Sequence, residues 1–279
     1  MWPVYFLLNK ILKIEEEGRE KFIESDGDQI GVAECCPFQL SSKDGTGCNA
    51  VLPSSHFVEV PHIKQLFSWD CGLACVLMVL TEIGINDYSI QDLAELCATT
   101  SIWTVDLAYL LQKFSVSFCY FTVTFGANPN YSVETFYKEQ LPKDLGRIDM
   151  LFQKAVEAGI SIKCRSIGRK EICQWMLSGK YIAIALVDQY KLKLSRFWSG
   201  DVTVLGFHDS HREYTGHYIL ICGYDAGKDE FEIRDPASSR KRDRISSKCL
   251  EEARKSFGTD EDLLLISLEE STKQKSYPV

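Results

Sequence analysis

Apolar residues recur at helical spacing in the first half of the chain and at strand spacing in the second. The segment Trp69–Leu80 is apolar on nearly all sides and precedes Gly84, which predicts a buried helix that ends near the glycine. Asp70 has the side chain of an N-cap residue, so Cys71 is expected in the first turn of this helix. Further helices are predicted at 89–97, 104–114, 131–139, 147–158 and 169–178, with Pro142 separating two of them.

Strand patterns dominate after residue 180. Residues 216–224 and 230–236 flank the polar turn 225–229, which predicts an antiparallel hairpin. Other strands are predicted at 116–124, 160–163, 181–187 and 263–268, another helix at 246–256, and a loop bordering the cleft at 188–215. Helices first and antiparallel strands later indicate an α+β fold, with a helical first half packed on a mainly antiparallel sheet.

The two ends of the chain differ from this middle part in composition. Much of the stretch before residue 56 is rich in charged residues, Gly, Ser, Asp and Asn and offers little core, so residues 1–55 are predicted to be a weakly ordered N-terminal segment. One domain is predicted at 56–268 and a C-terminal tail at 269–279. The role of the N-terminal segment stays open.

The bulk composition is that of a globular protein and restricts the partners. The chain has 279 residues, 45% of them hydrophobic, and a formal net charge of −8 that repels phosphate backbones, so no nucleic-acid partner is expected. The basic run at 240–244 is interpreted as a solvated loop, with an anion-binding or nuclear-import patch as the alternative. Apolar stretches fall short of the roughly 18–20 residues that span a bilayer, so we expect a soluble protein.

The cysteines indicate a reducing compartment. There are 11 of them, an odd number, and several lie in apolar runs, as buried small hydrophobes do. A disulfide framework is typical of shorter chains with an even count. Cytoplasmic localisation is therefore expected, with the nucleus as an alternative. No zinc-like spacing stands out, so neither a metal nor a cofactor is predicted.

Cys71 is the candidate nucleophile. A thiol hydrolase needs a thiolate at neutral pH, whereas free cysteine titrates near pH 8.5. The positive end of a helix and a nearby imidazolium both favour the thiolate, and Cys71 opens a predicted helix. Gly72 would let a substrate and the backbone approach closely at this turn. The competing interpretation is a core cysteine, which is what Cys75 is predicted to be.

His217 and Asp235 belong to the two arms of the predicted hairpin. His217 begins one arm and Asp235 ends the other, so the two side chains are expected side by side across the ladder. A carboxylate in that place can hold the imidazole for the thiol. Gln65 lies six residues before Cys71 (71 − 65 = 6) on the loop that enters the helix, where its amide and the Cys71 N–H could donate to an oxyanion.

These motifs resemble those of the bacteriocin-processing, papain-like (C39-like) peptidases. The likeness is carried by Q-x5-CGLA at 65–74, GHYILI at 216–221 and IRDP at 233–236, and the layout extends over roughly 57–240. The resemblance implies a papain-like fold in which Cys71 is the nucleophile, His217 its base, Asp235 the orienter of that base and Gln65 an oxyanion donor.

The chain as a whole also resembles the eukaryotic guanylyl-cyclase-domain-containing protein family, related to a plant soluble guanylyl cyclase. The likeness is carried by HIKQLFSWDCGLAC at 62–75 and GHY at 216–218, and it implies conversion of GTP to cyclic GMP. The residues argue otherwise, because such chemistry usually needs carboxylates that hold two metals and cationic groups on the triphosphate. No P-loop is present, and no pairing selects Asp201, Asp209 or Asp225 as metal ligands.

Three functions remain open from the sequence. The first is a cysteine hydrolase that acts on a peptide, isopeptide or related acyl bond. The second is a catalytically silent papain-like binding or scaffold protein with a peptide or protein partner. The third is a guanylyl cyclase. The sequence predicts neither the substrate nor the oligomeric state.

Overall fold

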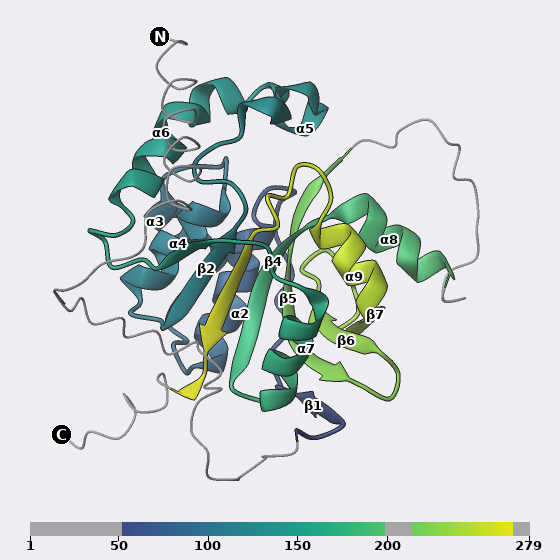
Figure 1. Cartoon of the computed structure of the whole chain (residues 1–279). Helices are drawn as coiled ribbons and strands as arrows, with labels where there is room; N and C mark the ends of the chain where they lie inside the picture. Colours follow the sequence, from purple (N-terminus) through teal and green to yellow (C-terminus); the bar gives the residue numbers. More distant parts are fainter. Residues whose placement is uncertain (1–51, 199–213, 270–279) are drawn as a thin grey trace, which may run out of the picture. The chain divides into compact units, whose positions relative to one another are not determined.

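A sheet of eight strands runs through the part of the chain that the structure describes (Figure 1). The computed structural model describes residues 52–198 and 214–269, which belong to one unit spanning 47–279. The strand order is β3-β2-β8-β4-β5-β6-β7, and β1 also pairs with β5. The strands are β1 (Ser55–Phe57), β2 (Phe118–Thr122), β3 (Ile162–Cys164), β4 (Tyr181–Asp188), β5 (Gly216–Asp225), β6 (Glu230–Arg234), β7 (Asp243–Ser246) and β8 (Leu263–Ser267).

The sheet is antiparallel except at one edge. Only β2 and β3 pair in parallel among the described strands, and every other neighbouring pair is antiparallel. The last strand, β8, lies between β2 and β4. It therefore joins strands of the helical first part to the predicted hairpin, which forms as β5 and β6.

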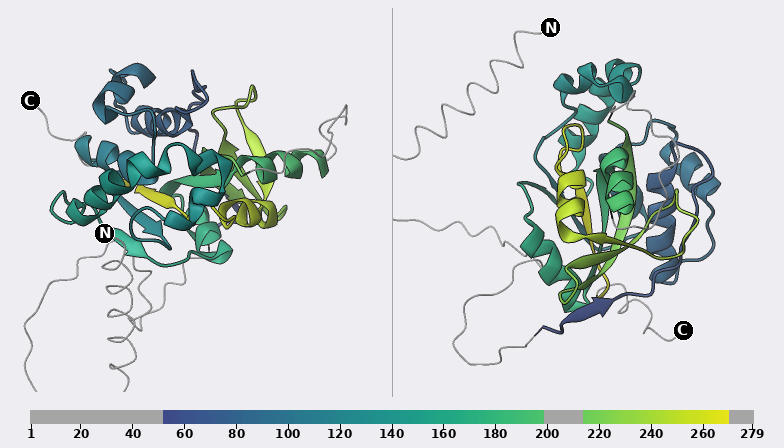
Figure 2. Two further views of the ribbon diagram at one scale, coloured as in Figure 1. Left: turned by 90° about the horizontal axis from the view of Figure 1, so that it is seen from above. Right: turned by 90° about the vertical axis from the view of Figure 1, so that its right-hand side faces the viewer.

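Helices cover both faces of this sheet. They are α2 (Cys71–Glu82), α3 (Ile90–Cys97), α4 (Thr104–Lys113), α5 (Thr135–Lys138), α6 (Leu141–Lys154), α7 (Arg169–Ser178), α8 (Gln189–Trp198) and α9 (Ser247–Arg254), with a 3-10 turn η1 at Pro129–Val133. Helices α2 and α4 contact the sheet on one face, and α7 and α9 contact it on the other (Figures 1 and 2). This two-sided cover is why strands β4, β5 and β8 are almost continuously apolar.

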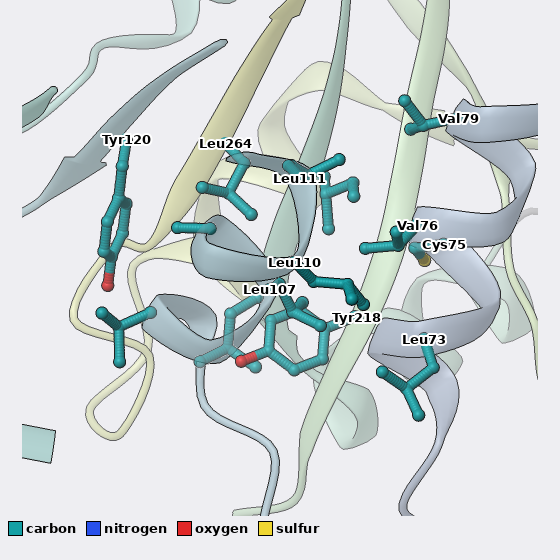
Figure 3. Close-up of a cluster of buried hydrophobic side chains, with 14 of the residues drawn as sticks. Leu73, Cys75, Val76, Val79, Leu107, Leu110, Leu111, Tyr120, Tyr218 and Leu264 are labelled. Carbon is teal, nitrogen blue, oxygen red and sulfur yellow. The ribbon is translucent and has the colours of Figure 1, made fainter. Parts of the chain in front are cut away.

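Helix α2 is buried on all sides between the sheet and its neighbours α3 and α4. Every residue from Cys71 to Leu80 is buried, which explains the absence of a polar stripe in this segment. Figure 3 shows Leu73 and Val76 of α2 in the same cluster as Leu107 of α4 and the Tyr218 ring of β5. The packing fixes the position of Cys71, which opens the helix.

The structure confirms the predicted fold class. A helical first half packs on a mainly antiparallel sheet, in an α+β arrangement. The predicted N-terminal segment at 1–55 and the predicted tail at 269–279 lie almost wholly outside the described residues.

Two predictions about local structure were wrong. Pro142 does not separate two helices but lies in the first turn of α6, where the missing N–H has no helical partner to lose. The predicted loop at 188–215 begins with helix α8, whose Leu192 is 1% exposed and packs inward.

The basic run at 240–244 is also more structured than a solvated loop. Its second part forms the edge strand β7, which pairs with β6. Arg242 pairs with Glu59, while Arg244 lies 3.6 Å from Glu232 and stacks over the Phe57 ring. These arginines are therefore engaged with other side chains of the chain itself.

Candidate active site

The first turn of α2 places Cys71 where helix and sheet meet. Asp70 is the N-cap residue, as predicted, but its carboxylate makes no capping hydrogen bond. It turns back and accepts the N–H groups of Leu66 and Phe67 at 3.1–3.2 Å, and it is fully buried. Asp70 therefore shapes the loop that enters the helix and leaves the positive end of the helix uncapped by its side chain.

The hairpin brings His217 and Asp235 together in the interior. His217 Nε2 donates to Asp235 Oδ1 at 2.7 Å, and the two residues are only 2% and 4% exposed. The register pairs Leu220 with Arg234, so Asp235, which follows β6, lies diagonally across from His217 rather than directly opposite. A diagonal neighbour is still within reach of a long side chain, which is why the contact forms.

Asp235 is held from both its side chain and its backbone. Its Oδ1 also accepts the Ala237 N–H at 2.9 Å, and its carbonyl accepts from His62 Nε2 at 2.9 Å and from the Ser238 N–H at 3.0 Å. A carboxylate fixed in this way fixes the imidazole that donates to it. With Nε2 occupied, only Nδ1 of His217 can serve the thiol.

The Cys71 sulfur lies against the first residues of β5. The Tyr218 N–H donates to Cys71 Sγ at 3.5 Å. Burial opposes the charged form of His217, but hydrogen bonds to Asp235 and to the Cys71 sulfur outweigh it and raise the pKa of His217 to about 9. The imidazolium is therefore the form expected at neutral pH, between a carboxylate and a sulfur.

Gln65 lies on a loop that is tied to the end of the hairpin. Its backbone N–H donates to the Pro236 carbonyl at 3.1 Å, so the loop runs beside the Asp235–Pro236 corner. Its side-chain amide donates to the Phe67 carbonyl at 2.7 Å, and its Oε1 is buried without a hydrogen-bond partner among the described residues. The structure thus places Gln65 near the site but gives its amide a contact within the loop, and its oxyanion role stays a prediction.

A cavity of about 460 Å³ opens beside the sulfur. Cys71 forms part of its wall. The rest comes from segments that are far apart in the sequence, including Trp69, Trp103, Phe136, Tyr218, Asp260 and Asp262. Trp69 lines the cavity and also packs against the core.

Sequence reasoning missed most of these cavity residues. Tyr218 stands next to His217 and could have been noticed from that position. Asp260 and Asp262 carry no local signal, because they become significant only when the loop before β8 approaches the start of α4. Thr104 of α4 marks that approach, because its hydroxyl bonds to the Asp262 carboxyl.

Gly72 is needed for a different reason from the one predicted. A Cβ at this position would lie 2.9 Å from Leu107 Cδ1 and 3.0 Å from Tyr218 Cδ2. The crowding therefore comes from α4 and β5, and a substrate is not required to explain the glycine. Cys75 is 0% exposed, in keeping with its predicted place in the core.

Of the three aspartates considered as metal ligands in the sequence, Asp225 lies among the described residues. Asp225 accepts from the N–H groups of Gly227 and Lys228 and so stabilises the turn of the hairpin. Asp201 and Asp209 lie outside the described residues. Within 52–198 and 214–269, no three His, Cys, Asp or Glu side chains are grouped in a way that could hold a metal ion.

Comparison with known proteins confirms the likeness to the guanylyl cyclase family. A family described as guanylylate cyclase matches residues 60–266. The chain belongs to this family. Guanylyl cyclase 1 of Arabidopsis thaliana is 61% identical over 277 residues, which cover 99% of this chain and 100% of that protein. A solved structure from Bacillus anthracis, described as a C39-like peptidase, is 13% identical with a TM-score of 0.40 and covers 76% of this chain and 96% of that one.

No helix in the described part of this guanylylate cyclase family member is long and apolar enough to cross a membrane. The longest, α6, has 14 residues, fewer than the roughly 20 that a spanning helix needs.

Proposed function

We propose that this chain is a cysteine hydrolase that acts on a peptide, isopeptide or related acyl bond. Cys71 is the nucleophile, His217 the base, Asp235 the residue that orients the base, and Gln65 an oxyanion donor. The observation that carries the proposal is the buried series of contacts from Asp235 through His217 to the Cys71 sulfur, which ends at a cavity.

The contacts support a sequence of proton transfers. The imidazolium of His217 favours the thiolate of Cys71, which attacks the carbonyl carbon of the substrate. The proton on Nδ1 then passes to the leaving amine, and an acyl thioester remains on the sulfur. Water, deprotonated by Nδ1, attacks the thioester and releases the acid and the thiol.

The oxyanion would form at the first turn of α2. The early N–H groups of a helix have no intrahelical acceptor, and the Asp70 side chain does not cap them. The Cys71 N–H is therefore available to a developing negative charge. Gln65 is the second donor in the proposal. Its side-chain amide carries two hydrogens, and the Phe67 carbonyl accepts one of them, so the other can be donated to the oxyanion.

Alkylation with iodoacetamide at pH 7, followed by peptide mapping, tests the proposal. Cys164 is exposed and Cys71 is buried, so accessibility alone predicts that Cys164 reacts first. Activation predicts the reverse order, with the Cys71 reaction slowed to the rate of an ordinary buried thiol in His217→Ala. Faster alkylation of Cys164 in the unmutated protein would count against a poised nucleophile. If Cys71 is alkylated first but no acyl substrate is turned over, the result would favour the alternative of a catalytically silent binding protein.

A second candidate is nucleotide cyclisation, favoured by the name of the 61% identical Arabidopsis thaliana relative. The cavity fits it poorly, because two carboxylates line it and no Lys or Arg does among the described residues. A triphosphate needs such cationic groups. Incubation with GTP and Mg²⁺ or Mn²⁺, with cyclic GMP measured by mass spectrometry, tests the cyclase against the hydrolase. Equal production by the unmutated protein and Cys71→Ser would support cyclisation and argue against a role for the thiol.

A further inference from the structure

The cavity beside Cys71 is aromatic and carries charge of one sign. Trp69, Trp103 and Phe136 contribute rings to its wall. Asp260 and Asp262 supply the carboxyl groups of its described lining, which holds no Lys, Arg or His, and burial raises the pKa of both. A cation in the cavity would therefore favour the ionised form of these carboxyls, whereas an anion would oppose it. Rings and carboxylates around one cavity form the usual surroundings of an organic cation.

Asp262 is a buried carboxylate with an unused acceptor. The residue is 6% exposed, and its Oδ1 has no hydrogen-bond partner among the described residues. Burial raises the pKa of Asp262 well above its usual range, and the neighbouring Asp260 raises it further. A buried polar atom without a partner is costly, and a bound ion or ligand is one way to satisfy it. A cation in the cavity would relieve both burial and repulsion.

The loop that carries these two carboxylates is held in place by tyrosines. Tyr131 donates to Asp260 Oδ1 at 2.6 Å. Tyr137 and Tyr214 both donate to the Gly258 carbonyl at 2.7 Å. The carboxylates are thus presented by a fixed segment, as a preformed binding site requires.

Tyr218 extends from the Cys71 sulfur to the acidic end of the cavity. Its backbone N–H donates to Cys71 Sγ, while its hydroxyl lies 2.9 Å from Thr104 Oγ1. Asp262 is close to that hydroxyl end, because its charge acts on the Tyr218 phenol and the Thr104 hydroxyl bonds to its carboxylate. One tyrosine therefore separates nucleophile from carboxylate, and lysine and arginine side chains have a similar length.

We propose that this cavity is the side-chain subsite of the hydrolase and selects a substrate with a lysine or arginine side chain next to the bond that is cleaved. The aliphatic stem packs on the aromatic wall, and the cationic head lies between Asp260 and Asp262. The substrate assignment rests on the proposed function, whereas the affinity of the cavity for a cation does not.

Benzamidine and benzamide are matched probes, because they share a shape and differ in charge. Their binding to the full-length Cys71→Ser protein can be measured by calorimetry at pH 7. We expect benzamidine to bind about tenfold or more tightly than benzamide, as a charge-assisted contact requires. Asp262→Asn, made in the same background, should remove most of this difference. Asp87→Asn, which removes an exposed carboxylate that does not line the cavity, should leave it unchanged.

The outcomes separate the cation site from the hydrolase. Equal binding of the two probes would overturn the cation site, even if iodoacetamide still reacts first with Cys71. A preference for benzamidine that survives both Asp262→Asn and Asp260→Asn would overturn the assignment of the carboxylates. Asp260→Asn also serves if Asp262→Asn does not fold. A preference that depends on these residues, in a protein whose Cys71 is unreactive, would support the cation site and sink the hydrolase.

Discussion

Two cysteines four residues apart on α2 have opposite surroundings. Cys71 opens the helix, lies at the cavity and contacts the ring of His217. Cys75 lies one turn further in, is completely buried, and has its pKa raised well above the usual range, mainly by burial. The same helix therefore carries one thiol that faces a cavity and an imidazole and one that packs in the core.

The difference comes from the neighbours and not from the helix. Both thiols are buried, but only Cys71 has a partner that carries a positive charge at neutral pH. That partner depends on Asp235, which compensates the burial of the imidazolium. The buried hydrogen bond between His217 of β5 and Asp235, which follows β6, therefore distinguishes the surroundings of the two thiols. The following predictions test this distinction.

The largest contrast is expected from removing each thiol in turn. Cys71→Ala should lower hydrolysis of an acyl substrate by about 10³-fold or more, since loss of the nucleophile removes the covalent route. Cys75→Ala should keep the reactivity of Cys71 and destabilise the protein by about 1–2 kcal/mol, through a small core cavity. Reaction rates and urea unfolding curves for both variants check this, and a Cys75→Ala protein without reactivity would contradict the distinction.

The second contrast concerns the carboxylate behind the ring. Asp235→Asn removes the group that most strongly favours the imidazolium, so the pKa of His217 should fall and its ring should be less well oriented. We expect alkylation of Cys71 to slow by about 10²- to 10⁴-fold. The rate should be measured from pH 5 to 10. Asp243→Asn, which changes another buried carboxylate, should keep the unmutated profile; if both variants behave alike, the loss is structural.

The third contrast appears as a dependence of stability on pH. The folded pKa of His217, about 9, lies above its ordinary value of 6.5. The stabilisation is therefore fully present below pH 6.5 and is lost as the pH rises through 9, by roughly 3 kcal/mol at most. Denaturant unfolding at pH 6 and pH 9 measures the loss. Buried thiols such as Cys75 and Cys222 have a raised pKa in the folded protein and so ionise at about pH 8–9 only on unfolding, which also lowers stability at high pH. The informative quantity is therefore the difference from His217→Gln, which should lack the His217 contribution.

The sequence predicted the helix and the hairpin that carry Cys71, His217 and Asp235 because their signals are local. An apolar run that begins after an aspartate gave α2, and a polar turn between two strand patterns gave the hairpin of His217 and Asp235. Those patterns do not say which N–H groups a side chain will reach. Asp70 was therefore correctly placed as an N-cap residue, but its contacts with Leu66 and Phe67 were not foreseen.

The cavity could not be predicted in the same way. Its walls meet only after β8 inserts between β2 and β4, which brings residues 260–262 to the start of α4. No periodicity or spacing records such a meeting of distant segments. The geometry of Gln65 shows the same limit, because its distance from Cys71 in sequence was informative but the partner of its amide depends on the fold of one loop.

The smallest effect is expected at Gly72, which follows Cys71 in the first turn of α2. Gly72→Ala introduces a methyl group 2.9–3.0 Å from side-chain carbons of Leu107 and Tyr218, which must shift. We expect a loss of about 1–2 kcal/mol from overpacking, offset in part by the better helix propensity of alanine. Because Tyr218 donates to the Cys71 sulfur, the same shift should also lower the alkylation rate of Cys71. Leu107→Ala in the Gly72→Ala background provides the space for the methyl group and should restore that rate, even though it costs stability. A rate that stays low in the double variant would mean that Gly72 acts on the thiol through something other than packing.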